Sequence, residues 1–165
     1  MEARRKNDTE MLFVGEFLHT IDSQRRIAVP KDWRIKDSEN KFYVLPGRHN
    51  SLQIMPHLAF KKLADKLRKV SIADPKASIA LAKLGASARV CVCDRQGRIP
   101  ISEKLLEYAK IKKGENIDSD LVLIGAFNCI QVWSKENWNK QQMSDSEMLD
   151  VIQKIEELSD DLNDI

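Results

Sequence analysis

The sequence predicts a mainly β protein with flanking helices, an α+β chain made of two copies of one unit and a C-terminal helix. The first observation is an internal duplication, because Asp22–Val29 recurs as Asp94–Ile101 with an offset of 72 residues. The second is that Gly47–Ile54 recurs as Gly125–Val132 with an offset of 78 residues. The third is that short apolar segments bounded by turn residues surround these motifs in both copies. Two motifs repeated in the same order indicate a duplicated unit.

The first motif of each copy joins two predicted strands through a tight turn. The strand pairs are Phe13–Ile21 with Arg26–Val29, and Ala88–Cys93 with Arg98–Ile101. The turns between them, which we call the tips, are Asp22–Arg25 and Asp94–Gly97. An Asp side chain can accept a hydrogen bond from the backbone two residues later, and a glycine in fourth place supplies a positive φ. Each tip is therefore expected to join a hairpin.

A short helix and a second hairpin follow in each copy. The helices begin at Pro30 and after Ser102, since proline suits a first helical turn and serine caps a helix N-terminus. Each second hairpin has a glycine and an asparagine in its turn. The expected strands are Phe42–Leu45 with Leu52–Met55, and Leu121–Ile124 with Ile130–Trp133.

The two copies end in different helices. The first continues into a basic amphipathic helix over His57–Val70 and a second helix that opens at Asp74-Pro75 and closes at Gly85. The second copy ends in a helix that the capping-box pattern Ser144-x-x-Glu147 begins. An apolar stripe with spacing 4, 3, 4, 3 follows, at Val151, Ile155, Leu158, Leu162 and Ile165. Such a stripe can form a short coiled coil, but we expect it to pack on its own domain.

Length and composition favour a globular protein of the cytoplasm. The 165 residues, 42% of them hydrophobic and 32% charged, suffice for one ordinary domain or two small fused units. The sequence contains no run of 18 apolar residues, so no membrane span is expected. The charged N-terminus lacks the apolar core of a signal peptide. Three cysteines suit a reducing compartment better than a disulfide scaffold.

The charge is distributed unevenly along the chain. Residues 144–165 hold eight acidic residues and one lysine, a net charge of −7, which leaves +9 for residues 1–143. A basic body with an acidic tail suggests a polyanionic partner, nucleic acid first. The alternative is an ordinary lysine-rich solvated face.

Catalytic and metal chemistry find little support in the sequence. The three histidines, His19, His49 and His57, lie in three different segments. Cys91-x-Cys93 places two thiols on one strand face, and the repeat offset sets His19 opposite Cys91, but this supplies at most three zinc ligands. No glycine-rich phosphate-binding motif is present. We therefore expect no enzyme activity, no catalytic residues, no metal and no cofactor.

Arginines at the two tips are the strongest candidates for binding. Arg26 and Arg98 begin the return strands, and Arg25 and Arg95 add a further cation to each tip. Guanidinium groups suit contacts to phosphates and bidentate pairing with guanine edges in a major groove. Asp22 and Asp94, with Gly97, shape the turns. The alternative is that each Asp and Arg only close the turn by a local salt bridge.

These motifs resemble a known bacterial family. Strand–Asp-x-x-Gly-Arg–strand followed by a short helix resembles the AbrB/SpoVT swapped-hairpin unit, and two such units in one chain resemble the MraZ family of transcriptional regulators. The matching strings are Val14-Gly-Glu-Phe-Leu-His-Thr-Ile-Asp22, Arg26-Ile-Ala-Val-Pro30, Asp94-Arg-Gln-Gly-Arg-Ile-Pro-Ile101 and Ile130-Gln-Val-Trp-Ser-Lys-Glu-Asn-Trp138. The resulting division is repeat 1 at 16–59, a helical connection at 60–87, repeat 2 at 88–137, and an acidic helix or tail at 138–165.

The resemblance implies a duplicated swapped-hairpin barrel with pseudo-twofold symmetry and a specific function. It implies a nucleoid-associated, non-enzymatic regulator that assembles into a ring-like homo-oligomer and binds double-stranded DNA at direct repeats in the promoter of the division and cell-wall gene cluster, usually repressing it. The family's DNA-binding arginines correspond to Arg26 and Arg98. One departure is that Arg25 stands where the second tip has Gly97, so a positive φ there would cost ~1–2 kcal/mol. The rival functions are an adaptor that binds another protein through the acidic tail, and an enzyme that uses the Cys91/Cys93 face.

Overall fold

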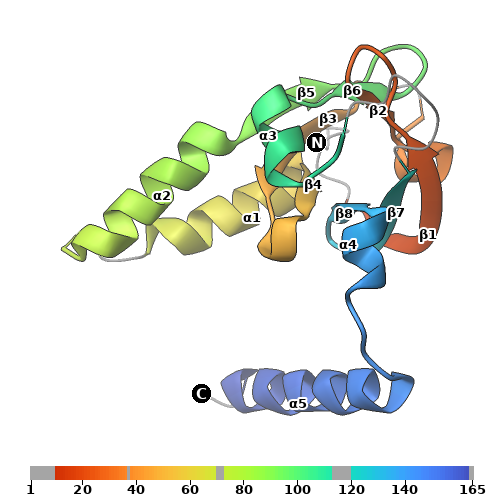
Figure 1. Ribbon diagram of the computed structural model, residues 1–165. Helices are drawn as coiled ribbons and strands as arrows, with labels where there is room; N and C mark the ends of the chain where they lie inside the picture. The colour runs from red at the N-terminus through yellow and green to blue at the C-terminus, as the bar shows by residue number, and fades with distance from the viewer. Residues whose placement is uncertain (1–9, 37, 70–72, 113–119, 164–165) are drawn as a thin grey trace, which may run out of the picture.

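A computed structural model describes residues 10–36, 38–69, 73–112 and 120–163 of the chain. Its eight strands form a six-stranded antiparallel sheet and a two-stranded ribbon, with helices outside (Figure 1). The strands are β1 (Phe13–Thr20), β2 (Arg26–Ala28), β3 (Lys41–Pro46), β4 (Leu52–Pro56), β5 (Arg89–Val92), β6 (Arg98–Pro100), β7 (Asp120–Phe127) and β8 (Ile130–Ser134). The helices are α1 (His57–Arg68), α2 (Pro75–Ser87), α3 (Glu103–Tyr108), α4 (Lys135–Asn139) and α5 (Asp145–Asn163). The predicted α+β class is confirmed.

The sheet order shows that the two repeats exchange strands. The six-stranded sheet runs β1-β7-β8-β4-β3-β5, so the first strand of each repeat pairs with the second hairpin of the other repeat. The short return strands β2 and β6 pair with each other. The expectation that each tip joins a hairpin of its own two flanking strands is therefore wrong, because both flanking strands find their partners in the other repeat. The second hairpins, β3–β4 and β7–β8, form as predicted.

A pseudo-twofold axis relates the repeats, and the strand registers show where it passes. Ile27 lies opposite Ile99 at the centre of the β2–β6 ribbon, and these residues are equivalent in the duplication. At the centre of the β4–β8 pair, Gln53 lies opposite its own equivalent, Gln131. Each repeat therefore supplies half of one structure, as the swapped-hairpin resemblance implies.

One apolar core joins both repeats. Phe13, Val44 and Ile54 from the sheet are almost fully buried together with Ile27 and Ile99 from the ribbon. β2 lies beside β1 and β6 beside β5, so the ribbon spans the two outer strands of the curled sheet (Figure 1). Because the core is built from both halves, neither repeat buries its apolar face by itself.

The helices differ from the expectations in their ends. After Pro30 only a 3₁₀ turn forms, over Lys31–Trp33, whereas Ser102 caps α3 as predicted through a hydrogen bond from the Leu105 N–H. α2 passes Gly85 and ends at Ser87, where the Ala88 N–H donates to the Leu84 carbonyl. Val70 and Ile165, which the helix predictions included, lie outside the described residues.

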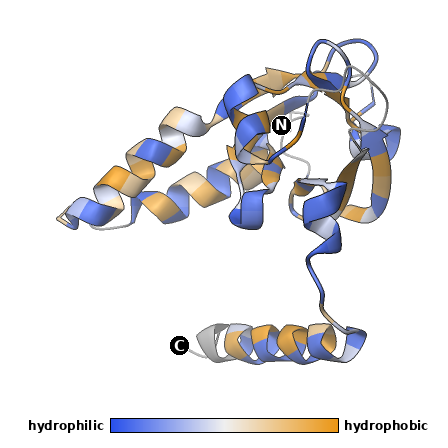
Figure 2. Cartoon of the chain, viewed as in Figure 1, coloured by the Kyte–Doolittle hydropathy of each residue, from blue (hydrophilic) through white to orange (hydrophobic). Residues whose placement is uncertain are grey.

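The C-terminal helix begins where the capping box places it. The Ser144 N–H donates to Glu147 Oε2 at 2.8 Å, and the Glu147 N–H donates to Ser144 Oγ at 3.2 Å. The expected packing of this helix on its own domain is wrong, because α5 stands apart from the sheet and leaves its stripe open (Figures 1 and 2). The segment between α4 and α5 carries the helix away from the core before its apolar residues begin. Among the described residues, no helix is both long and apolar enough to cross a membrane.

Candidate nucleic-acid interface

The two tips lie side by side although 72 residues separate them in the sequence. Pairing of β2 with β6 brings them together, and two equivalent backbone hydrogen bonds extend that pairing. The Val29 N–H donates to the Gly97 carbonyl and the Ile101 N–H donates to the Arg25 carbonyl, each at 2.8 Å. Each tip is thus attached to the return strand of the other repeat. One edge of the molecule therefore presents two equivalent loops.

Each tip has the Asp-centred turn that the sequence predicts. Asp22 Oδ1 accepts from the backbone N–H groups of Gln24 at 2.9 Å and Arg26 at 2.8 Å. Asp94 Oδ1 accepts in the same way from Gln96 at 2.9 Å and Arg98 at 3.0 Å. The turn-shaping geometry predicted for both aspartates is present in the structure.

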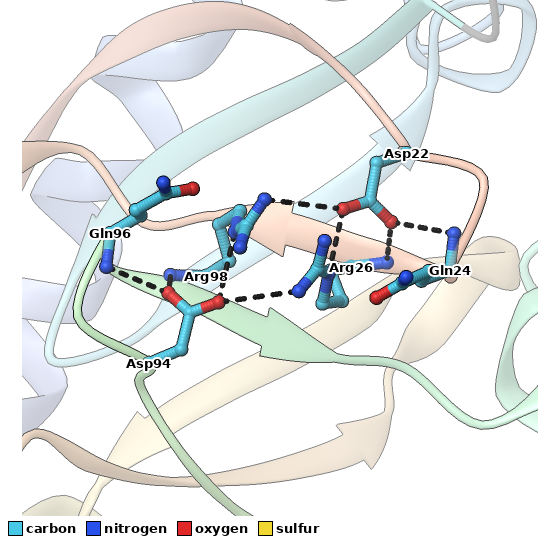
Figure 3. A network of polar contacts seen from close by, with 6 residues as sticks. All are labelled: Asp22, Gln24, Arg26, Asp94, Gln96 and Arg98. Carbon is cyan, nitrogen blue, oxygen red and sulfur yellow. Dashed lines mark hydrogen bonds and ion pairs between the residues drawn. The ribbon is translucent and has the colours of Figure 1, made fainter.

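The second oxygen of each aspartate joins the tips into one ion-pair network (Figure 3). Asp22 Oδ2 lies 2.7 Å from Arg26 Nε, and Asp94 Oδ2 lies 2.9 Å from Arg98 Nε. Each guanidinium also reaches the other repeat's carboxylate, Arg26 Nη1 to Asp94 at 3.5 Å and Arg98 Nη1 to Asp22 at 3.8 Å. The local salt bridge between Asp and Arg, which the sequence analysis gave as the alternative, is therefore present in both tips. The ion pairs also extend across the pseudo-twofold axis.

Partial exposure leaves this network accessible to a ligand. The side chains of Arg26 and Arg98 are 25% and 29% exposed, and those of Asp22 and Asp94 are 30% and 34% exposed. The carboxylates fix the orientation of the guanidinium groups through the Nε edge. Each arginine is consequently held in one pose while part of it faces solvent.

The network keeps both carboxylates ionised. Burial alone would raise the pKa of Asp22, but hydrogen bonds from Arg26 and Gln24 outweigh it and hold that pKa below its usual range. For Asp94 the backbone N–H of Arg98 has the largest effect, and its pKa is likewise lowered. The ion pairs therefore persist throughout the neutral range.

The fourth tip position distinguishes the two loops. Arg25 has φ of 59° and Gly97 has φ of 76°, so both tips need the left-handed region that glycine adopts freely. The first tip thus keeps the shape of the second and places a larger residue in it. Arg25 Nη1 pairs with Glu103 Oε2 at 3.2 Å, while the guanidinium of Arg34 lies against Gly97.

Arg95 borders a charged hollow that the sequence does not reveal, and the acidic residues Asp32, Glu39 and Asp94 form part of its lining. Arg95 is exposed, and three further basic residues, Lys31, Arg34 and Lys36, also line the hollow. These three residues belong to repeat 1, whereas Arg95 belongs to repeat 2. The strand exchange brings them together, so no spacing in the sequence could indicate it.

The histidine and cysteine residues do not assemble into a site. His19 lies opposite Leu121 and Cys91 opposite Phe42, so the expected apposition of His19 with Cys91 is wrong. The Cys91 thiol donates to the Pro100 carbonyl at 3.3 Å, and burial raises the pKa of Cys93 to about 11. Within the described ranges, no three His, Cys, Asp or Glu side chains cluster in a way that could hold a metal ion.

Comparison with known proteins agrees with the resemblance noted in the sequence. The family model described as "MraZ protein, putative antitoxin-like" matches the chain twice, over residues 12–82 and 84–160. The chain is 32% identical over 145 residues to the transcriptional regulator MraZ of Natranaerobius thermophilus. The aligned residues cover 87% of this chain and 96% of the relative. It is 32% identical over 154 residues to that of Finegoldia magna, with 93% and 99% covered.

A third relative is as similar. The transcriptional regulator MraZ of Desulforamulus reducens is 34% identical over 131 residues, which are 78% of this chain and 86% of the relative. The two family matches coincide with the two halves that the strand exchange joins. These relatives are named as regulators and not as enzymes, in agreement with the non-enzymatic function expected from the sequence. The chain belongs to the MraZ family of transcriptional regulators.

Proposed function

We propose that this chain regulates transcription by binding double-stranded DNA sequence-specifically through its paired tips. The observation that carries the proposal is the placement of four arginines, Arg25, Arg26, Arg95 and Arg98, on two equivalent loops that lie side by side. A duplex carries closely spaced phosphates and guanine edges, and arginine can pair with both. A twofold pair of loops can contact two neighbouring stretches of one groove.

The arginines divide into two roles. Arg26 and Arg98 are oriented by carboxylates from both repeats, which suits the directional contacts that read base edges. Arg95 is exposed, and the side chain of Arg25 is 42% exposed, which suits contacts to phosphates. Asp22, Asp94 and Gly97 maintain the loop shape that presents all four.

The targets are direct repeats upstream of the division and cell-wall gene cluster, where bound protein represses transcription. A ring-like homo-oligomer would present one pair of tips per copy, so that several repeats are bound together. Linked contacts of this kind raise the affinity by ~10²–10⁴ without any new type of contact. Because the two repeats exchange strands within one chain, this exchange needs no second copy.

The test is a titration of the protein's own upstream DNA across a series of salt concentrations. Arg98→Ala should reduce discrimination between that DNA and a scrambled duplex by ~1–3 kcal/mol. Arg48→Ala is the matched control, because Arg48 is exposed in the turn between β3 and β4. Equal discrimination by the two variants, with native circular dichroism in both, would refute base reading by the tips.

A second candidate function is that of an adaptor without DNA binding, built on the same barrel. The exposed apolar stripe of α5 favours it, because such a surface suits protein binding. An adaptor would show no salt-dependent affinity for duplex DNA, whereas the tip proposal requires a steep salt dependence. The same titration therefore separates the two.

A further inference from the structure

Among the residues that the structure describes, the apolar face of α5 packs against no other segment. Along the helix, Met148, Val151, Ile155 and Leu158 repeat at intervals of three and four residues, and their exposed fractions are 45%, 43%, 56% and 65%. Ile152, beside them, is 44% exposed. Figure 2 shows these apolar segments along a helix that stands clear of the sheet. A stripe of this size is typical of a helix that packs against another surface.

A groove between α1 and α2 is the complementary feature. Neither helix has a buried residue, although both carry many apolar side chains. The two helices extend from the sheet as a pair (Figure 1). The apolar side chains that line the groove between them, with Leu45 and Ala88 at its base, are Phe60, Leu63, Ala64, Leu67, Leu81 and Leu84. An amphipathic helix laid in such a groove would cover its apolar walls.

The charges of the two surfaces are opposite. Residues 145–160 of α5 include six acidic side chains and one lysine. α1 holds Lys61, Lys62, Lys66 and Arg68 against a single Asp65, and Arg68 itself lines the groove. Two α5 helices packed together would instead bring like charges into contact, which disfavours a coiled coil between them.

We propose that α5 of one copy binds in the α1–α2 groove of a second copy of this chain. The proposal deepens the assembly in the proposed function and rests on it. Each chain holds both halves of the contact on separate parts of its surface, so every copy can bind one neighbour and be bound by another. Such a head-to-tail contact generates a closed ring when the rotation between successive copies brings the last copy back to the first.

The first experiment measures the mass of the full-length protein by light scattering after size exclusion. Ile155→Asp places a charge in the middle of the stripe and should abolish the oligomer. Gln153→Asp is the matched control, because it adds the same charge to the same helix outside the stripe. An unchanged mass for Ile155→Asp, or an equal loss for both variants, would overturn the proposal.

The second experiment identifies the partner surface by disulfide crosslinking. One chain carries Ala64→Cys in the groove and another carries Ile155→Cys in the stripe; the wild-type chain reports the background of its three native cysteines. A crosslinked dimer should form when the two variants are mixed and not with either alone. A dimer of Ile155→Cys by itself indicates α5–α5 pairing. A third chain carries both substitutions, and a crosslink that forms only within this chain indicates docking on the same copy. Either result, or no crosslink, overturns the proposal.

DNA binding distinguishes failure of this inference from failure of the proposed function. On a duplex with one target repeat, Ile155→Asp should bind as the wild type does. On a duplex with several repeats, it should lose about 10²-fold or more of the affinity that linked contacts supply. If Ile155→Asp keeps full affinity on both duplexes, the α5 contact fails while tip recognition stands. If neither protein discriminates the target from a scrambled duplex, tip recognition fails.

Discussion

Replacement of Arg25 separates its backbone role from its charge. With φ of 59°, a non-glycine residue stores ~1–2 kcal/mol in the left-handed region. Glycine removes this strain, but it also increases the entropy of the unfolded chain, which lowers the free energy of unfolding by ~0.4–1 kcal/mol. The ion pair with Glu103 contributes ~0.2–1 kcal/mol at most, because its side chains are 42% and 74% exposed. Arg25→Gly should therefore be about as stable as the wild type.

The matched variant is Arg25→Ala, which loses the same ion pair and the same cation but keeps the strained φ. Arg25→Gly should be more stable than Arg25→Ala by ~0.5–1 kcal/mol in urea unfolding, the strain relieved less the entropy gained. In a DNA titration the two variants should behave alike, because both lose one positive charge. The slope of log affinity against log salt should fall by ~0.9 for each if Arg25 contacts one phosphate.

Either half of the reasoning can fail independently. Equal stability of Arg25→Gly and Arg25→Ala would show that the backbone strain at this position is no larger than the entropy term of ~0.4–1 kcal/mol, below the range expected here. An unchanged salt slope in both variants would show that Arg25 makes no phosphate contact and serves only its ion pair with Glu103.

Three further predictions concern the tips and the tail. Gly97→Ala should lower the free energy of unfolding by ~1–2 kcal/mol or more, because φ is positive at this position and the new Cβ would meet the Arg34 guanidinium. A urea unfolding curve that matches the wild type would contradict this. Asp22 and Asp94 have lowered pKa values in the folded protein, so their ion pairs contribute full stability at pH values above the ordinary pKa of 3.8. This stability should be lost as the pH falls through the pKa of the folded protein. In thermal melts, the melting temperature of Asp94→Asn should therefore fall less with acidification than that of the wild type. Truncation after Lys140 should leave the circular dichroism and cooperative unfolding of the body intact, since α5 does not pack on it; a truncated chain that fails to fold would place the stripe in the core.

Features that depend on near neighbours in the chain are predictable from the sequence. The turn at Asp22 and the capping box at Ser144 form between residues two to four positions apart, so spacing alone indicates them. The need for a positive φ at Arg25 follows from its equivalence to Gly97 in the duplication. The strand segments themselves follow from short apolar segments bounded by turn residues.

The choice of strand partner is not predictable in this way. β1 could have paired with its own return strand or with β7, and both pairings satisfy the same local pattern of backbone donors and acceptors. Burial decides between them, because only exchange between repeats surrounds Ile27 and Ile99 with a common core. This exchange in turn brings Arg26 within reach of Asp94.

The sequence by itself determined the duplication, the tip chemistry and the amphipathic character of α5, since these depend on residue type and short-range spacing. Only the tertiary structure decided that the tips share one ion-pair network and that the hollow beside Arg95 draws its cations from the other repeat. It also decided that the stripe of α5 is exposed and that the helix stands apart from the core (Figure 1). The physical reason is that contacts between distant segments are selected by the burial of the whole chain, which no short stretch of sequence contains.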